Sequence, residues 1–119
     1  MGLARSLGLA LVLYALAATA VALPLHDAAR EGNVALVEQL LAQGVDVNVV
    51  DETRNTALHH AVAEAQIDVV NALLKRHSKL DINARNNAGE TPLHLAGSKG
   101  RQKIAALLID HGAEINAVD

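Results

Sequence analysis

The sequence predicts an all-α fold built from stacked pairs of short helices. The segment Leu25-His26-Asp27-Ala28 returns as Leu58-His59-His60-Ala61 and as Leu93-His94-Leu95-Ala96, with steps of 33 and 35 residues between the histidines. A nearly constant period of this size is typical of a stacked repeat. The chain has no Phe, no Trp and one Tyr, so its core must consist of small aliphatic side chains, which suit thin helix pairs.

The first helix of each unit has recognisable start and stop signals. Thr91 stands where a hydroxyl can accept a backbone N–H, and Pro92 follows at the first helical position, where no N–H is needed. Gly32 and Gly100 come one short helix later, where a left-handed residue ends a helix.

The second helix of each unit carries apolar residues at helical spacing, and Gly44 and Gly112 are expected to end it. Residues 48–55 and 83–90 are rich in Asn and charge, have no helical period and are expected to form extended, hairpin-like loops. The predicted core of the second helices is Val37, Leu40, Leu41, Val70, Leu73, Leu74, Ile104, Leu107 and Leu108.

These features resemble the ankyrin repeat. The segment from Thr91 to Ala96 matches the family's helix-opening motif, and residues 107–116 resemble its second-helix ending. The resemblance covers residues 23–119, with repeats at about 23–55, 56–90 and 91–119. It implies an ankyrin-repeat solenoid of helix-turn-helix units with hairpin-like loops, acting as a binding scaffold without catalysis.

Several positions depart from the family pattern. Leu23 replaces Thr in the first unit, and Ala57 replaces Pro in the second. Arg54 and Ala65 stand where the family has Gly, so the hairpin tip at Arg54 should change conformation or be strained. The third unit has little obvious polar capping, for which we expect a longer array, a frayed third repeat, or a dimer covering this end.

The first 22 residues differ from the rest. Arg5 precedes an apolar run over residues 7–22 that ends in Ala20-Val21-Ala22, the order of a secretory signal peptide cleaved after Ala22. The run lacks the polar face of a buried domain helix. An uncleaved membrane anchor is the alternative, although the run is shorter than the roughly 20 residues of a spanning helix. The expected location is therefore secreted or periplasmic, or else membrane-anchored.

Composition and motifs argue against chemistry. Cysteine is absent, and the formal net charge of −3 gives no general attraction to nucleic acid. No Gly-rich phosphate loop occurs, and no nucleophile and base stand at a recognisable spacing. We therefore expect no enzymatic activity, no catalytic residues and no cofactor.

The six histidines predict no metal site. The resemblance implies that the motif histidines tie one repeat's opening turn to the next, and helices stacked about 8–10 Å apart hold these rings too far apart to share an ion. His77 and His111 lie near the ends of second helices, where the helix dipole favours a cation. His60 is expected to be exposed and merely solvated. The motif histidines are His26, His59 and His94.

The resemblance places the partner surface on hairpin tips and on first helices, with two further residues near the ends of second helices. The partner is another protein of unknown identity; the alternative role is a membrane-tethered or self-associating structural spacer, with self-association through the third repeat. The predicted partner-binding residues are Arg30, Glu31, Gln43, Glu52, Thr53, Asn55, Ala63, Glu64, Asn87, Ala88, Glu90, Ser98, Lys99 and His111.

Overall fold

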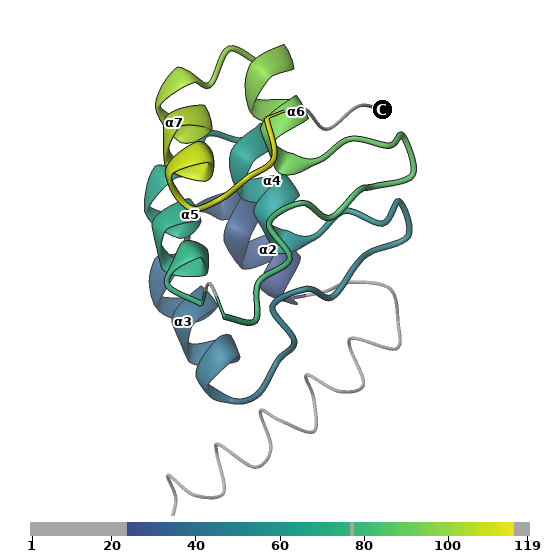
Figure 1. Cartoon of the computed structure of the whole chain (residues 1–119). Helices are drawn as coiled ribbons and strands as arrows, with labels where there is room; N and C mark the ends of the chain where they lie inside the picture. Colours follow the sequence, from purple (N-terminus) through teal and green to yellow (C-terminus); the bar gives the residue numbers. More distant parts are fainter. Residues whose placement is uncertain (1–23, 77, 116–119) are drawn as a thin grey trace, which may run out of the picture.

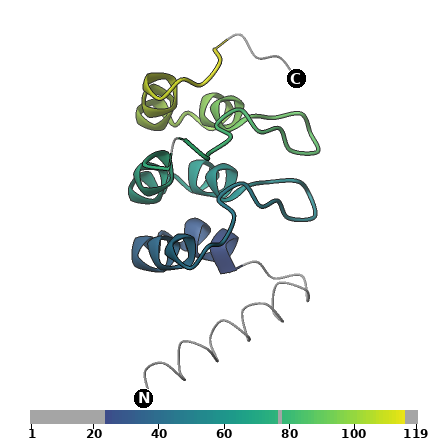
Figure 2. The ribbon, with the colours of Figure 1, turned by 60° about the horizontal axis from the view of Figure 1, so that its bottom comes forward.

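The computed structural model describes residues 24–76 and 78–115, which fold into three stacked helix pairs (Figure 1). The inner row contains α2 (Pro24–Glu31), α4 (Ala57–Ala63) and α6 (Pro92–Ser98). The outer row contains α3 (Val34–Ala42), α5 (Ile67–Leu74) and α7 (Gln102–Asp110). Seen along the layers, two long loops leave the stack on the same side, beyond the inner row (Figure 2). The predicted all-α solenoid of helix pairs is confirmed.

Two sequence predictions fall outside this part of the chain. The predicted signal peptide lies within residues 1–23, which are outside the described residues. The predicted place of His77 near the end of a second helix is outside them as well. None of the helices in residues 24–76 and 78–115 combines the length and the apolarity that crossing a bilayer requires.

Two of the inner helices, α4 and α6, begin with reciprocal caps made by a threonine and a histidine. Thr56 Oγ1 accepts the backbone N–H of His59 at 3.3 Å, and His59 Nδ1 accepts the backbone N–H of Thr56 at 3.1 Å. Thr91 and His94 repeat this pattern at 3.2 and 3.0 Å. The histidine thus takes the place that Glu or Gln usually has in a capping box. The predicted cap at Thr91 is confirmed.

Left-handed residues end the inner helices and shape the hairpin tips. Gly32 and Gly100 have φ angles of 79° and 69°, as predicted. Ala65 takes the same conformation with a φ of 58°, and Arg54 has a φ of 63° where Gly89 of the next hairpin has 79°. Arg54 therefore keeps the glycine conformation under strain. A Cβ atom in this region costs about 1–2 kcal/mol, which the surrounding contacts must offset.

The predicted core is largely confirmed. Eight of the nine predicted outer-helix positions are buried, and Leu107 of α7 is half-buried because no described helix packs against the far side of that layer. The inner helices add buried leucine and alanine, including Leu25 and Leu58, which are fully covered. Small side chains let the two rows approach closely, as the composition predicted.

Side chains at equivalent positions tie each layer to the one before it. Gln66 Nε2 donates to the Arg30 carbonyl at 2.9 Å, and Arg101 Nη2 donates to the Ala63 carbonyl at 2.9 Å. Each of these residues precedes an outer helix and reaches the carboxyl end of the previous inner helix. The two bonds satisfy carbonyls that a helix end leaves unpaired.

A second tie follows the outer helices. Asn48 Nδ2 donates to the Lys79 carbonyl at 2.6 Å, and its Oδ1 accepts the N–H of Asp81 at 2.7 Å. Asn83 occupies the same place one layer later and accepts the N–H of Glu114 at 3.0 Å. The layers are therefore joined by a polar contact at each loop as well as by apolar packing.

The third repeat forms both of its helices, α6 and α7. Its surface nevertheless exposes large apolar side chains: Ile109 is 40% exposed and Ile115 is 67% exposed. The three alternatives for this end, a longer array, a frayed third repeat and a dimer that covers it, stay predictions.

Candidate functional site

The two long loops are hairpins built around one polar side chain each. Asp51 Oδ1 accepts the backbone N–H groups of Thr53 and Asn55, both at 3.0 Å, and the Thr53 hydroxyl at 2.9 Å. Asn86 Oδ1 accepts two backbone N–H groups, also at 3.0 Å, in the next loop. Each loop is closed by a backbone bond, such as that from Asp51 N–H to the Asn55 carbonyl at 3.1 Å. The predicted hairpin-like loops are confirmed.

The hairpins are also bonded to each other. The Asn87 backbone N–H donates to the Thr53 carbonyl at 2.9 Å, and Asn87 Nδ2 donates to the Glu52 carbonyl at 3.3 Å. Nearer the helices, Asn86 Nδ2 donates to Asn55 Oδ1 at 2.9 Å. The tips therefore form one shared surface, held in place before any partner arrives.

Most of the predicted partner-binding residues lie on the surface. Four of them are less exposed than the others, since they are half-buried: Gln43, Asn55, Ala63 and Glu90. The side chains of Asn55 and Glu90 accept hydrogen bonds from Asn86 within the hairpins. Gln43 and His111 are the C-cap residues of α3 and α7 and thus belong to the outer row. The exposed residues are Arg30, Glu31, Glu52, Thr53, Glu64, Asn87, Ala88, Ser98, Lys99 and His111.

Two of the motif histidines, His26 and His59, join the inner helices to the hairpins, as predicted. Nε2 of His26 bonds to the Asn55 carbonyl at 2.9 Å, and Nε2 of His59 bonds to the Glu90 carbonyl at 2.8 Å. Burial lowers the pKa of both imidazoles below 6.5, although these carbonyls act in the opposite direction. The rings therefore favour the neutral form, in which the nitrogen facing the carbonyl carries the proton.

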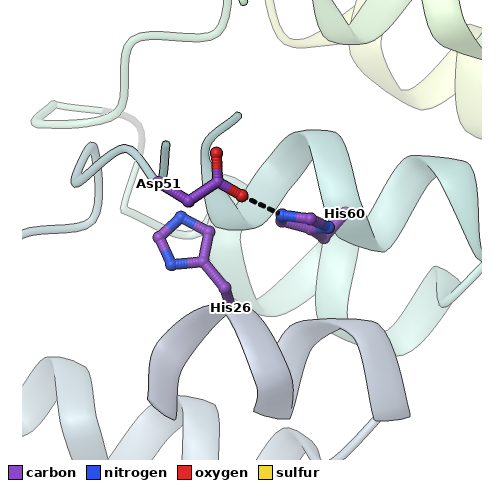
Figure 3. Close-up of side chains that lie close together, drawn as sticks. All are labelled: His26, Asp51 and His60. Carbon is purple, nitrogen blue, oxygen red and sulfur yellow. Dashed lines mark hydrogen bonds and ion pairs between the residues drawn. The ribbon is translucent and has the colours of Figure 1, made fainter. Parts of the chain in front are cut away.

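The prediction for His60 was wrong, because this side chain is not a solitary solvated histidine. Its Nε2 bonds to Asp51 Oδ2 at 2.8 Å, and its side chain is only 17% exposed (Figure 3). The ring of His26 meets it edge to face, with centroids 5.3 Å apart. His26 from α2, Asp51 from the first hairpin and His60 from α4 offer ligand atoms within 4.8 Å of one another.

Asp51 is held as a carboxylate by its neighbours. Burial alone would raise its pKa, but hydrogen bonds from His60, Asn55 and Thr53 lower the pKa to about 2. Its Oδ1 atom is committed to the hairpin, whereas Oδ2 faces the two imidazoles. The cluster therefore combines one carboxylate oxygen and two imidazole rings between the first two layers, where His26 is buried and Asp51 and His60 are half-buried.

Sequence reasoning missed this cluster because it compared only equivalent positions of the repeats. The three residues come from different positions of the repeat. His26 is the motif histidine, Asp51 is the residue whose N–H closes the hairpin, and His60 follows the next motif histidine. A signal was available, since Asn86 and Leu95 occupy the places of Asp51 and His60 one unit later. Two departures toward metal-ligating types at one junction would have drawn attention to it.

Comparison with known proteins agrees with this architecture. The family model described as ankyrin repeats in three copies matches residues 25–119. An ankyrin repeat-containing protein of Arabidopsis thaliana, ITN1, is 33% identical over 114 residues, covering 77% of this chain and 19% of that protein. Human neurogenic locus notch homolog protein 2 is 40% identical over 95 residues, covering 80% of this chain and 4% of that protein.

A third relative, the zebrafish ankyrin repeat and SOCS box protein 11, is 40% identical over 92 residues, covering 76% of this chain and 30% of that protein. The chain thus spans less than a third of the length of each of these three relatives. Repeats of this kind are in general interaction modules that present a binding surface, with no catalytic machinery of their own. On its sequence match and its three stacked helix pairs, the chain belongs to the ankyrin-repeat family.

Proposed function

We propose that this chain is a protein-binding scaffold that acts outside the cytosol through its hairpin tips and inner helices. The observation that carries this proposal is the bonding of Asn87 to Thr53 and Glu52, which fixes the two tips side by side. A surface that is ordered before binding loses little entropy when a partner docks, so polar tips of this kind suit recognition. Membership of the ankyrin-repeat family supports the same role.

The surface composition favours a partner of modest affinity. Residues 24–76 and 78–115 contain no Phe, Trp or Tyr, and Arg30 is the one arginine among the exposed predicted residues. Aromatic and arginine side chains are the usual anchors of tight interfaces. Without them, acidic side chains such as Glu31, Glu52 and Glu64 are expected to steer and orient a basic partner surface.

Reversing these three charges tests the proposal. A variant carrying Glu31→Lys, Glu52→Lys and Glu64→Lys should retain at most about a tenth of the partner captured by the unmodified chain. All three side chains are exposed, whereas Glu90 is half-buried and accepts a hydrogen bond from Asn86, so Glu90 is left unchanged. Capture would be measured by quantitative mass spectrometry of proteins bound from the native extracytosolic fraction.

The outer row supplies a control with the same change of charge. Glu38, Asp68 and Asp110 are exposed, one on each outer helix, and their replacement by lysine should leave capture unchanged. Circular dichroism of both variants verifies that helicity is retained. If the outer set abolished capture and the inner set did not, the partner would dock on the outer helices and the proposed surface would be wrong.

Action outside the cytosol rests on the sequence of the first 22 residues. Export would remove the apolar run and leave a chain beginning at Leu23, directly before α2. N-terminal sequencing of the exported protein is expected to read Leu-Pro-Leu-His-Asp. An intact Met1 on a membrane-bound chain would instead support the anchored form.

A further inference from the structure

We propose that His26, Asp51 and His60 form a zinc-binding site that clamps the first two repeats together. The three side chains come from α2, the first hairpin and α4, so one ion would bridge the inner helices of both repeats and the hairpin between them (Figure 3). Nothing in the binding of a protein partner at the tips requires this site.

The donor set suits zinc. Two imidazole nitrogens and one carboxylate oxygen are ligands that Zn²⁺ accepts, with water completing a tetrahedron. Bond lengths of about 2.0–2.1 Å place the ligand atoms of a tetrahedral site roughly 3.3 Å apart. The three ligand atoms here lie within 4.8 Å of one another. Side-chain rotations that shorten each distance by about 1.5 Å or less bring the atoms to the tetrahedral spacing.

The carboxylate is already aimed. Three hydrogen bonds from Thr53 and Asn55 hold Asp51 Oδ1, and Oδ2 is left facing the imidazoles. Outer contacts that orient a ligand in this way strengthen metal binding, because the ligand need not be ordered by the ion. Zinc would replace the proton that His60 Nε2 donates to the Asp51 carboxylate, and that proton would be released to solvent.

His26 can turn a lone pair toward the ion, whereas the equivalent His59 is fixed. Nδ1 of His59 accepts from both the backbone N–H and the hydroxyl of Thr56, so its proton must stay on Nε2. The sequence has Leu23 where Thr56 stands, and Nδ1 of His26 has no full hydrogen-bond partner among the described residues. The His26 proton can therefore move from Nε2 to Nδ1 without displacing another donor.

That transfer has one cost and one compensation. His26 gives up its bond to the Asn55 carbonyl when Nε2 turns to the ion. The backbone of Val49 raises the pKa of the ring, as a hydrogen-bond acceptor does, and its carbonyl would accept the new N–H at Nδ1. A metal-bound histidine usually donates its second N–H to such a carbonyl.

The next junction of the same chain lacks the ligands. There His59 is followed by Asn86 and Leu95 in the places of Asp51 and His60, and neither supplies a carboxylate or an imidazole. Asn86 nevertheless caps its hairpin as Asp51 does, with two backbone bonds at 3.0 Å. The ligand set is therefore separable from the requirements of the fold.

This difference provides the variants for the test. The purified chain would be titrated with Zn²⁺ by calorimetry, and one ion per chain is expected to bind. Asp51→Asn and His60→Leu copy the second junction and should each weaken binding by at least about 100-fold while leaving helicity unchanged. His111→Gln removes an exposed histidine outside the cluster and should leave the affinity as it was.

Thermal melting gives a second measurement on the unmodified chain. Because the ion would bind only the stacked state, Zn²⁺ at a hundredfold excess over Kd should raise the melting temperature by roughly 10 °C, reversibly with EDTA. In NMR spectra of the unmodified chain, added Zn²⁺ should shift the imidazole signals of His26 and His60 and those of no other histidine. This measurement uses no variant, so it does not depend on whether a variant folds. Absence of saturable binding, or equal affinity in all variants, would overturn the site.

Discussion

The variant Leu58→Ala is expected to lower the free energy of unfolding by about 3–5 kcal/mol. Leu58 is fully covered and lies on α4, the middle helix of the inner row, so removal of its side chain leaves a cavity between layers. A domain of this size is stable by only about 5–15 kcal/mol. Because stacked repeats are coupled only to their neighbours, a weakened middle repeat also uncouples the first from the third.

Leu93 is the matched control for this substitution. It holds the same motif position in the third repeat but is only half-buried, so Leu93→Ala should lower the free energy of unfolding by less than about 2 kcal/mol. Urea denaturation followed by circular dichroism measures both variants. Equal losses at the two positions would contradict the burial described for the end layer.

Replacement of His59 by alanine is expected to reduce the free energy of unfolding by about 3 kcal/mol. The ring is 1% exposed and serves three groups: the backbone N–H and hydroxyl of Thr56 and the carbonyl of Glu90. Without the ring these buried groups lose their partners, and each unsatisfied buried group costs about 1–3 kcal/mol. The exposed His111 provides a control whose replacement should change stability by less than about 0.5 kcal/mol.

The same variant should alter the dependence of stability on pH. Burial lowers the pKa of His59 below 6.5, so the folded state binds fewer protons than the unfolded chain near that pH. The stabilisation is complete above about pH 6.5 and declines as the pH falls through 6.5 toward the lowered pKa, by up to about 1.4 kcal/mol per pH unit for each such histidine.

His26 has a pKa shifted in the same direction, so His59→Ala should remove part of this slope and leave the rest. Denaturation curves at intervals between about pH 7.5 and pH 5 provide the comparison. An unchanged slope in the variant would mean that the buried ring of His59 does not exclude a proton, contrary to the geometry at Thr56.

The sequence was sufficient for the helices and their ends because local chemistry decides them. The caps at Thr91 and Gly100 follow from residues close together in the chain, whereas the role of His59, whose Nε2 reaches the Glu90 carbonyl, was implied by the family resemblance. Ala65 illustrates where local preference failed to decide, since packing holds an alanine in a conformation that favours glycine. The tertiary contacts select the backbone there, and the side chain tolerates it.

The cluster at the first junction could not be read in the same way. His60 reaches Asp51 and His26 only after two layers have stacked, and the three residues share no helical face or repeat position. The spacing in the sequence shows which residues hold equivalent positions in successive repeats. Contacts between layers depend instead on how far the hairpin folds back over the inner helices. That distance is a property of the assembled stack.

Several of the bonds that join the layers end on main-chain carbonyl oxygens. His26 reaches the carbonyl of Asn55, Gln66 that of Arg30, and Arg101 that of Ala63. Every amino acid supplies a main-chain carbonyl oxygen, so the side chains at these acceptor positions can change without loss of the hydrogen bond between the layers. Duplication of a whole unit would regenerate the same bonds, and the surface residues between them would be free to diversify. Point substitutions on the surface can therefore create new binding specificities while the hydrogen bonds between the layers are kept.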